Sequence, residues 1–542
     1  MGFRKSERDL ESQSLLYITV VAFFLLLVFG CTDTVSESPE EPDETVLARV
    51  GEKTISVNEF IRRAEYTMRP EYCMRDNYIH KKIVLNSLIA EKLFALEAGE
   101  VTELHSNAEF RAFLKGRKEQ AMRQYLQYAE AGKDVQVDTA EIRSVYKQAG
   151  RTYRVQYINI PEERYQGDFA RELRASGDLS ALHRTLYGSR EVPEKAVTWA
   201  DASARPLHQA LYGKSVKKGE ILGPLRSVEN MVTLLKVESW VDRKAIGDRE
   251  VRERWNMVHE RLHGYATAAR FQSLVSEIMA GKQLDFNAET FYALVEIFAP
   301  LYLRDEEEKQ SMANAVFWKK ERDTEIFNSV RSSIEKYMDY PLLKIDEELW
   351  TVRDFQEAQK SHPLVFRSKQ LNRKNFAGQF KLAVVDLVRD HYLTREAYSR
   401  GYDQVNIVQR DLAMWEDHME ALYHRNQYLR QAGFSGSFGT RYMQAIDEHL
   451  NPYVDQLQAR YSDRISINYE VFGEIELTGI DMFATLENVP YPVAVPSFPV
   501  LTTDHWLNYG GTIEDTGGGS GTARTSFNTD GNGGTTAHNA EI

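Results

Sequence analysis

The sequence predicts an α+β protein that is mostly helical, in which a duplicated helical module carries a small α/β domain inserted in its first copy. Three observations favour this fold class. The chain has 542 residues, too many for one hydrophobic core. A strand–turn–helix pattern that begins near Val46 recurs from Leu342. A strand-rich segment, roughly Tyr153 to Trp240, interrupts the helices of the first copy.

The chain begins with a segment typical of export. Three basic residues precede an apolar run from Leu15 to Phe29. That run is shorter than the roughly 20 residues of a membrane-spanning helix, and it fits the hydrophobic region of a signal peptide. The letters VFGC, which end at Cys31, resemble a bacterial lipobox. In this interpretation residues 1–30 are removed and Cys31 carries the lipid. An uncleaved membrane anchor is the alternative, and both place the remaining chain outside the cytoplasm.

Residues 31–45 are rich in acid, Ser and Pro, so they are expected to form a flexible tether. Thr32 stands where some bacteria with two membranes use Asp to retain a lipoprotein at the inner membrane. An outer-membrane location would follow in an organism that uses that rule. The chain has two cysteines, and lipidation of Cys31 would leave Cys73 alone. Cys73 is therefore expected to be a small, partly buried residue without a disulfide.

Folded protein is predicted to begin at residue 46. Val46, Ala48 and Val50 alternate with other residues in the period of a half-buried strand. A short second strand follows, and Ser56 with Glu59 three residues later is a capping-box pattern that starts a helix. An amphipathic helix is predicted over 79–96 and a further helix over 109–130.

Three parts of this pattern recur in the same order, which indicates an internal duplication. LARVGEKTISVNEF from Leu47 is echoed by LLKIDEELWTVRDF from Leu342, and LIAEKLFALEAGE by LVRDHYLTREAYSRG. The two copies also end in similar segments, LDFNAETF from Leu284 and ISINYEVF from Ile465.

The inserted segment reads as strand, helix, loop and strand, whereas the end of the chain is Pro-punctuated and then rich in Gly, Thr and Asn. The predicted organisation is a signal peptide (1–30), a tether (31–45), the first part of module one (46–150), the inserted domain (151–242), the returning helix of module one (243–300), module two (301–478) and an extended and disordered tail (479–542).

These residues together resemble the SurA/PrsA-type extracytoplasmic foldases, in which a helical chaperone module carries a parvulin-type prolyl isomerase domain. VLARVGEKTISVNEF and EKLFALEAGE are similar to the chaperone part. DVQVDTAEIRSVYKQAGRTYRVQYINI is similar to the segment that leads into the parvulin domain, LHQALYGKSVKKGEILGPL to its helix and turn, and VENMVTLLKVESW to its closing strand. The resemblance covers about residues 46–300 and, through the repeat, the second copy. It makes the inserted segment a parvulin-like domain.

The parvulin resemblance departs from the family at the residues that shape the active site. Active parvulins carry a histidine in the first strand where this chain has Tyr157, and a second in the last strand where it has Thr233. The glycine-rich turn of the family is reduced to KAVTW, which keeps Trp199. No catalytic residue is therefore assigned, and the isomerase activity is expected to be weak or lost.

The resemblance implies a lipid-anchored extracytoplasmic chaperone that binds unfolded or extended segments of exported polypeptides. One alternative is an active peptidyl-prolyl cis-trans isomerase whose pocket tolerates Tyr157 and Thr233. The other is a non-catalytic lipoprotein that binds one fixed partner. The net charge of −13 argues against nucleic acid as a partner.

No cofactor or metal is expected from the sequence. The thirteen histidines show no metal-ligand spacing, and Glu420 with His424 on one helical face is interpreted as solvated surface. GFSGSFG, from Gly433 to Gly439, lacks the spacing of a nucleophile loop.

Overall fold

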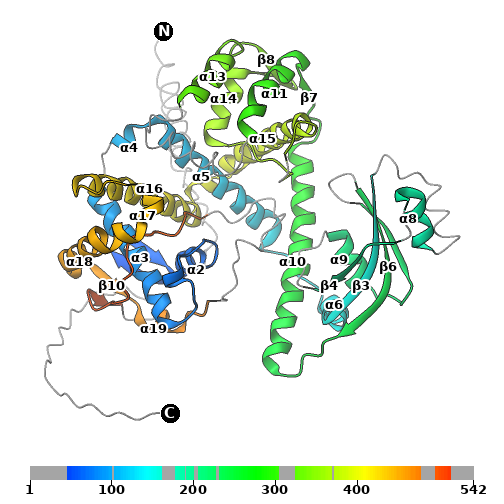
Figure 1. Cartoon of the computed structure of the whole chain (residues 1–542), viewed down its shortest axis with the longest axis horizontal. Coiled ribbons are helices and arrows are strands. Elements are labelled where there is room, and N and C mark those ends of the chain that lie inside the picture. The colour runs from blue at the N-terminus through cyan, green and yellow to red at the C-terminus, as the bar shows by residue number, and fades with distance from the viewer. Residues whose placement is uncertain are drawn as a thin grey trace, which may run out of the picture. The chain divides into compact units, whose positions relative to one another are not determined.

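The computed structural model confirms an α+β fold that is mostly helical (Figure 1). No described helix is long and apolar enough to span a membrane. The predicted signal peptide, Cys31 and the acidic tether lie outside the described residues. The structure describes residues 45–99, 103–161, 178–188, 191–199, 205–226, 231–303, 324–368, 371–436, 438–477 and 495–513.

The described elements in chain order are β1 (Val46–Val50), β2 (Lys53–Ser56), α2 (Val57–Glu65), η1 (Glu71–Cys73), α3 (Tyr78–Ala98), α4 (Glu103–Ser106), α5 (Ala108–Gln127), η2 (Tyr128–Gly132), α6 (Thr139–Ala149), β3 (Arg151–Pro161), α8 (Leu179–Tyr187), β4 (Glu194–Val197), α9 (Arg205–Tyr212), β5 (Ile221–Arg226), β6 (Met231–Asp242), α10 (Asp248–Ile278), β7 (Leu284–Phe286), α11 (Ala288–Tyr302), α13 (Thr324–Glu335), β8 (Pro341–Ile345), β9 (Glu348–Thr351), α14 (Val352–Ser361), α15 (Phe376–Ser399), η5 (Tyr402–Gln404), α16 (Asn406–Gln431), α17 (Phe438–Ala445), η6 (Ile446–Leu450), α18 (Asn451–Arg460), η7 (Ser462–Arg464), β10 (Ile465–Ile467), α19 (Tyr469–Glu474) and β11 (Gly511–Thr512).

The first sheet joins strands from opposite ends of the folded chain. Its order is β11-β10-β1-β2, and β1 with β2 forms the predicted hairpin. β10 pairs antiparallel with the other edge of β1, with Ala48 opposite Ile467. β11 then pairs in parallel with β10. The opening hairpin therefore reaches its full hydrogen bonding only when the last part of the chain has joined it.

Helices from both ends of the chain share one core around this sheet. Ser56 caps α2, since its hydroxyl accepts from the amide of Glu59, as the capping-box pattern predicts. α3 packs against α2, α16 and α18. The sequence predicts an amphipathic helix here, but the side chains from Ile83 to Ala95 are buried all round. The reason is that elements cover α3 on more than one side, so its polar residues must find partners inside the protein.

The second sheet has the same local arrangement in the middle of the chain. Its order is β7-β8-β9, and β7 pairs antiparallel with β8, with Phe286 opposite Leu343. α14 follows the β8–β9 hairpin directly and begins with a capping box between Thr351 and Asp354. Phenylalanines of α11, α14 and α15 pack with the strands of this sheet in one core, among them Phe298.

The third sheet lies within the predicted inserted domain. Its order is β4-β3-β6-β5, with all neighbours antiparallel. α8 covers one face, where Ile158 and Leu234 contact Leu182 in a small core. α6 and α9 lie against the opposite face, and Val258 of α10 belongs to the core on that side. α10, predicted as the returning helix of the first module, therefore packs on the inserted segment as well.

The extended part of the predicted tail contributes to the core, and the predicted disorder from Gly510 onward is wrong for residues 510–513, which include β11. Phe498, Leu501 and Leu507 are buried in the core around the first sheet, and β11 pairs there with β10. The Pro-punctuated composition of VPSFPV indicates an extended chain, and this chain is held by burying its apolar side chains. Residues 514–542 of the tail lie outside the described part of the chain.

Candidate functional site

The structure places Tyr157 and Thr233 on neighbouring strands of the third sheet. Tyr157 on β3 lies opposite Leu235, and Thr233 on β6 lies opposite Asn159, two pairs further along. The Thr233 hydroxyl lies 2.7 Å from the Asn159 side-chain oxygen and donates to it. The ammonium of Lys195 lies 5.4 Å from the centre of the Tyr157 ring. The two positions are therefore close, and neither carries an imidazole.

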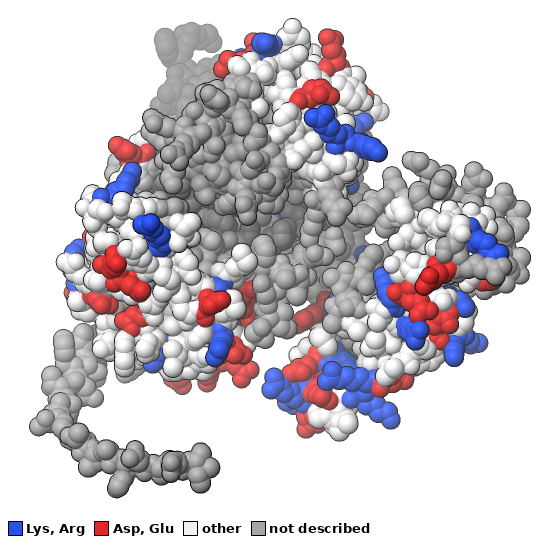
Figure 2. Space-filling view, in the orientation of Figure 1, with Lys and Arg blue, Asp and Glu red and all other residues white. Residues whose placement is uncertain are grey.

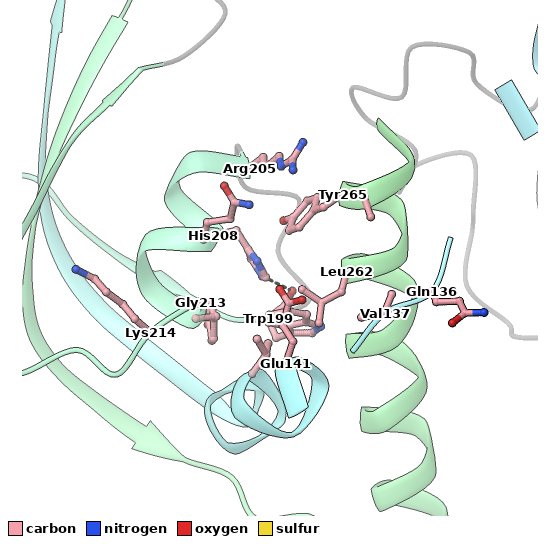
Figure 3. Close-up of a pocket in the computed structure, with 14 residues that line it drawn as sticks. Gln136, Val137, Glu141, Trp199, Arg205, His208, Gly213, Lys214, Leu262 and Tyr265 are labelled. Carbon is pink, nitrogen blue, oxygen red and sulfur yellow. Dashed lines mark hydrogen bonds between the residues drawn. The ribbon is translucent and has the colours of Figure 1, made fainter. Parts of the chain in front are cut away.

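A cavity of about 430 Å³ lies in the same part of the chain, between α9, α6 and α10 (Figure 3). Its size falls within the roughly 300–1,000 Å³ of typical ligand pockets. Trp199, His208 and Tyr212 give it aromatic surface from one side, and Leu262 and Tyr265 close it from α10. Polar residues at its boundary are Gln136, Glu141, Arg205 and Lys214.

The aromatic wall is built from rings in mutual contact. The His208 ring stacks on Tyr212 with centroids 4.8 Å apart, and it lies 4.2 Å from the Trp199 ring. Trp199 meets Tyr212 edge-on at 5.3 Å. The Tyr212 hydroxyl lies 2.9 Å from the carbonyl oxygens of Arg151 and Val197, on the strands beneath. These contacts hold the wall in one arrangement, so the cavity is preformed.

Arg261 on α10 contacts both His208 and the backbone of Trp199. One guanidinium nitrogen of Arg261 lies 2.8 Å from His208 Nε2 and 2.6 Å from the carbonyl oxygen of Trp199. His208 Nε2 itself lies 3.3 Å from the same carbonyl oxygen. His208 thus fastens α9 to α10 and to the segment after β4.

The aromatic residues of the cavity are largely buried. Trp199 is 4 % exposed, and its buried indole N–H has no hydrogen-bond partner among the residues that the structure describes. The guanidinium of Arg205 lies 4.8 Å from the Tyr265 ring, and burial raises the pKa of Tyr265. Tyr265 therefore stays neutral at physiological pH. The cavity offers aromatic faces and has charged residues at its boundary, which suits binding of an apolar group.

A possible metal-ligand cluster lies elsewhere. His105, Glu416 and Glu420 have ligand atoms within 4.8 Å of one another. His105 Nε2 lies 3.1 Å from a Glu420 oxygen, and the Lys53 ammonium lies 3.5 Å from the other. Burial raises the pKa of Glu420, and Lys53 opposes that shift. The lysine already supplies a cation here, so we interpret the cluster as an ion-pair network.

On the face shown in Figure 2, acidic and basic side chains are interspersed over the described residues, and neither sign forms a continuous patch.

No family model matches the chain, and neither a curated protein nor a solved structure does. The site is therefore interpreted from its own geometry. Sequence reasoning located Tyr157, Thr233 and Trp199 but missed His208 and Tyr265. LHQALYG predicts a helix without marking a site, and the apolar side of α10 is the signal that this helix closes a cavity.

Proposed function

We propose that this protein is a lipid-anchored extracytoplasmic chaperone that binds extended segments of exported polypeptides. The observation that carries the proposal is the preformed aromatic cavity beside α9. An unfolded chain presents single apolar side chains, and the cavity offers aromatic faces that could bury them. Contacts of that kind tolerate many sequences because they do not depend on a unique hydrogen-bond pattern.

The proposal includes a parvulin-like origin for the segment 151–242, with its isomerase activity weak or lost. The four-stranded antiparallel sheet with helices on both faces is compatible with that origin. The loss of activity is supported by Tyr157 and Thr233, since Thr233 donates to Asn159 where the family has a histidine. His208 cannot substitute for them, because Arg261 and two aromatic rings hold it in the wall of the cavity.

The proposal also includes two copies of one helical module. Val57 and Val352, which correspond in the repeat, are the first residues of α2 and α14. Asn287 and Asn468 follow β7 and β10, and their side chains cap the next helix in the same way. Their backbone amides both donate at 2.9 Å, to the carbonyls of Leu342 and Leu47 respectively. The copies would then exchange their last strands, since each closing strand pairs with the hairpin of the other half.

An experiment on the cavity tests the proposal. Ala266 lines the cavity, and Ala266→Trp would fill it without deleting a core side chain. Ala268→Trp, on the exposed side of α10, is the matched control. The readouts are aggregation of two unrelated denatured proteins and the Kd of an unstructured peptide with proline between apolar residues. In Ala266→Trp the peptide can no longer bury an apolar side chain in the cavity. That burial contributes about 1.5–3 kcal/mol, so we expect the peptide to bind roughly 10- to 100-fold more weakly. Equal activity of both variants and the unaltered chain would contradict the proposal.

Two further measurements distinguish the alternative functions. Acceleration of proline-limited refolding by the full chain, beside a histidine-containing parvulin, would make the protein an active isomerase. Failure to protect either denatured protein would favour a lipoprotein with one fixed partner. Lipid on Cys31, read by mass spectrometry of membrane-extracted protein, tests the proposed anchoring. The full chain is needed because Phe498, Leu501 and Leu507 belong to the core.

A further inference from the structure

A serine, a histidine and a carboxylate from three distant parts of the chain form a hydrogen-bonded row beside the first sheet. Ser497 Oγ lies 3.2 Å from His418 Nε2, and His418 Nδ1 lies 2.6 Å from a Glu91 oxygen. Ser497 belongs to the extended segment 495–513, His418 to α16 and Glu91 to α3. These are the two contacts that define a nucleophile, its general base and the group that orients the base.

The protonation states follow from the partners of Glu91. Arg63 donates to both Glu91 oxygens, at 2.7 and 2.9 Å. Burial alone would favour the neutral acid, but Arg63 and His418 hold the pKa of Glu91 well below its usual range. An ionised carboxylate only accepts, so His418 carries a proton on Nδ1. Burial also lowers the pKa of His418, which leaves Nε2 unprotonated at neutral pH and free to take a proton from Ser497.

The three side chains differ in exposure in the order that this chemistry needs. Ser497 is exposed, whereas His418 is 4 % exposed and Glu91 is fully buried. The backbone around Ser497 is held in place, because Arg63 donates at 2.8 Å to its carbonyl oxygen and the next residue, Phe498, is buried. The hydroxyl can therefore meet a reagent from solution while its base stays shielded from competing water.

We propose that Ser497, His418 and Glu91 form a catalytic triad that accepts acyl groups from carboxylic esters. Ser497 Oγ would bond to the ester carbonyl carbon while its proton passes to His418 Nε2. The bond from that carbon to the alkoxy oxygen would break, and the alkoxide would leave with the proton from His418. Water, activated by the same imidazole, would release the acid from Ser497. Arg63 is a positioning residue, since it touches Glu91 and the Ser497 carbonyl.

The alternative role of this row is structural: its hydrogen bonds would hold residues 495–513 against α16. The two roles differ in the reactivity of the serine. In the structural role Ser497 would react with an electrophile no faster than other exposed serines, because no base would accept its proton during the reaction.

An alkyl fluorophosphonate applied to the full chain distinguishes them. Ser497 Oγ bonds to phosphorus, the P–F bond breaks, fluoride leaves and the proton passes to His418. We expect one adduct per chain, mapped to Ser497 by mass spectrometry. Ser497→Ala should abolish it, His418→Gln should slow it at least ~100-fold, and Ser106→Ala, which removes another exposed serine, should leave it unchanged. No adduct, several serines labelled equally, or an undiminished rate in His418→Gln would overturn the triad.

A pH profile of the unaltered chain keeps the test decisive if the His418→Gln chain does not fold. The charged groups that face His418 are Glu91 from α3, Arg63 from α2 and Arg425 from its own helix. With His418 as base, the labelling rate should rise through one ionisation below pH ~6.5 and then stay level. A rate that keeps rising with hydroxide up to pH ~9 would mean that no base assists Ser497.

Discussion

Asp390 on α15 predicts a specific dependence of stability on pH. Its carboxylate accepts from His362 at 2.9 Å and from Arg389 at 2.7 Å, and Arg123 of α5 lies 3.8 Å away. Burial would raise the pKa of Asp390, but these partners lower it from 3.8 to about 2. The difference of about 1.8, at 1.36 kcal/mol for each pKa unit, corresponds to ~2 kcal/mol of stability. Because the folded-state pKa is depressed, this stability is present above pH ~4 and is lost as pH falls towards 2.

Asp390→Asn tests that reasoning, since it removes the titration and keeps the shape. We expect the variant to be less stable than the unaltered chain by ~2 kcal/mol or more near pH 6, and the difference to shrink as pH falls from about 4 to 2.5. Urea gradients with pulsed hydrogen exchange, read on peptides of α15, measure it locally, because so large a chain need not unfold as one unit. Glu357→Gln, at an exposed pair with Lys360, is the control and should change little. A difference that stays constant across this pH range would refute the assignment.

Three further outcomes follow from packing. Gly116→Ala in α5 should lower the free energy of unfolding by about 1–3 kcal/mol, because the new Cβ would lie 2.0 Å from the Ser361 carbonyl oxygen. Gly264→Ala in α10 should raise it by up to ~1 kcal/mol, because the new Cβ meets no atom within 4 Å. Urea unfolding measures both. Phe498→Ala should lower the free energy of unfolding of the first-sheet core by about 3–5 kcal/mol. Hydrogen exchange of the amides of β1 and β10 measures this change. Unchanged protection of those amides would contradict the place of Phe498 in the core. Cys73 should not react with a thiol reagent near pH 8 until urea unfolds the chain, because it is fully buried and burial raises its pKa to about 12; rapid reaction of the native chain would show otherwise.

The local elements could be predicted from the sequence because short-range rules decide them. The alternation from Val46 to Val50 indicates a strand, and Ser56, at the end of the next strand, caps a helix, as the structure has it. The second partner of the first strand, β10, could not be predicted. Periodicity says which side of a strand is apolar, but it does not say which later strand pairs with its edge. The burial of Phe498, Leu501 and Leu507 could not be predicted for a related reason, since frequent proline indicates an extended chain and does not say what that chain packs against.

The candidate site shows the same limit. The resemblance places Tyr157 on the first strand of the inserted segment and Thr233 on its last, and the structure adds that these two strands, β3 and β6, pair with each other. The cavity could not be predicted, since it exists only where α10 packs on α9 and α6. Polar residues in α3 carried a usable signal. Glu91 and Lys92 interrupt an apolar helix, and a charge that cannot reach water must find a partner. That argument predicts a buried ionic network without naming its members.

The members of that network come from both halves of the chain, and this connects the fold to the proposed chemistry. Arg63 and Glu91 lie before the inserted segment, whereas His418 and Ser497 lie after it. The pairing of β1 with β10 brings these parts together, and Lys92 adds a buried ion pair to Asp417 on α16 at 2.8 Å. Removing one member of such a pair leaves an uncompensated buried charge, which costs about 3–5 kcal/mol. The contacts that close the first sheet therefore also assemble the row that ends at Ser497, and a chain without its final segment would lose the nucleophile and part of the core together.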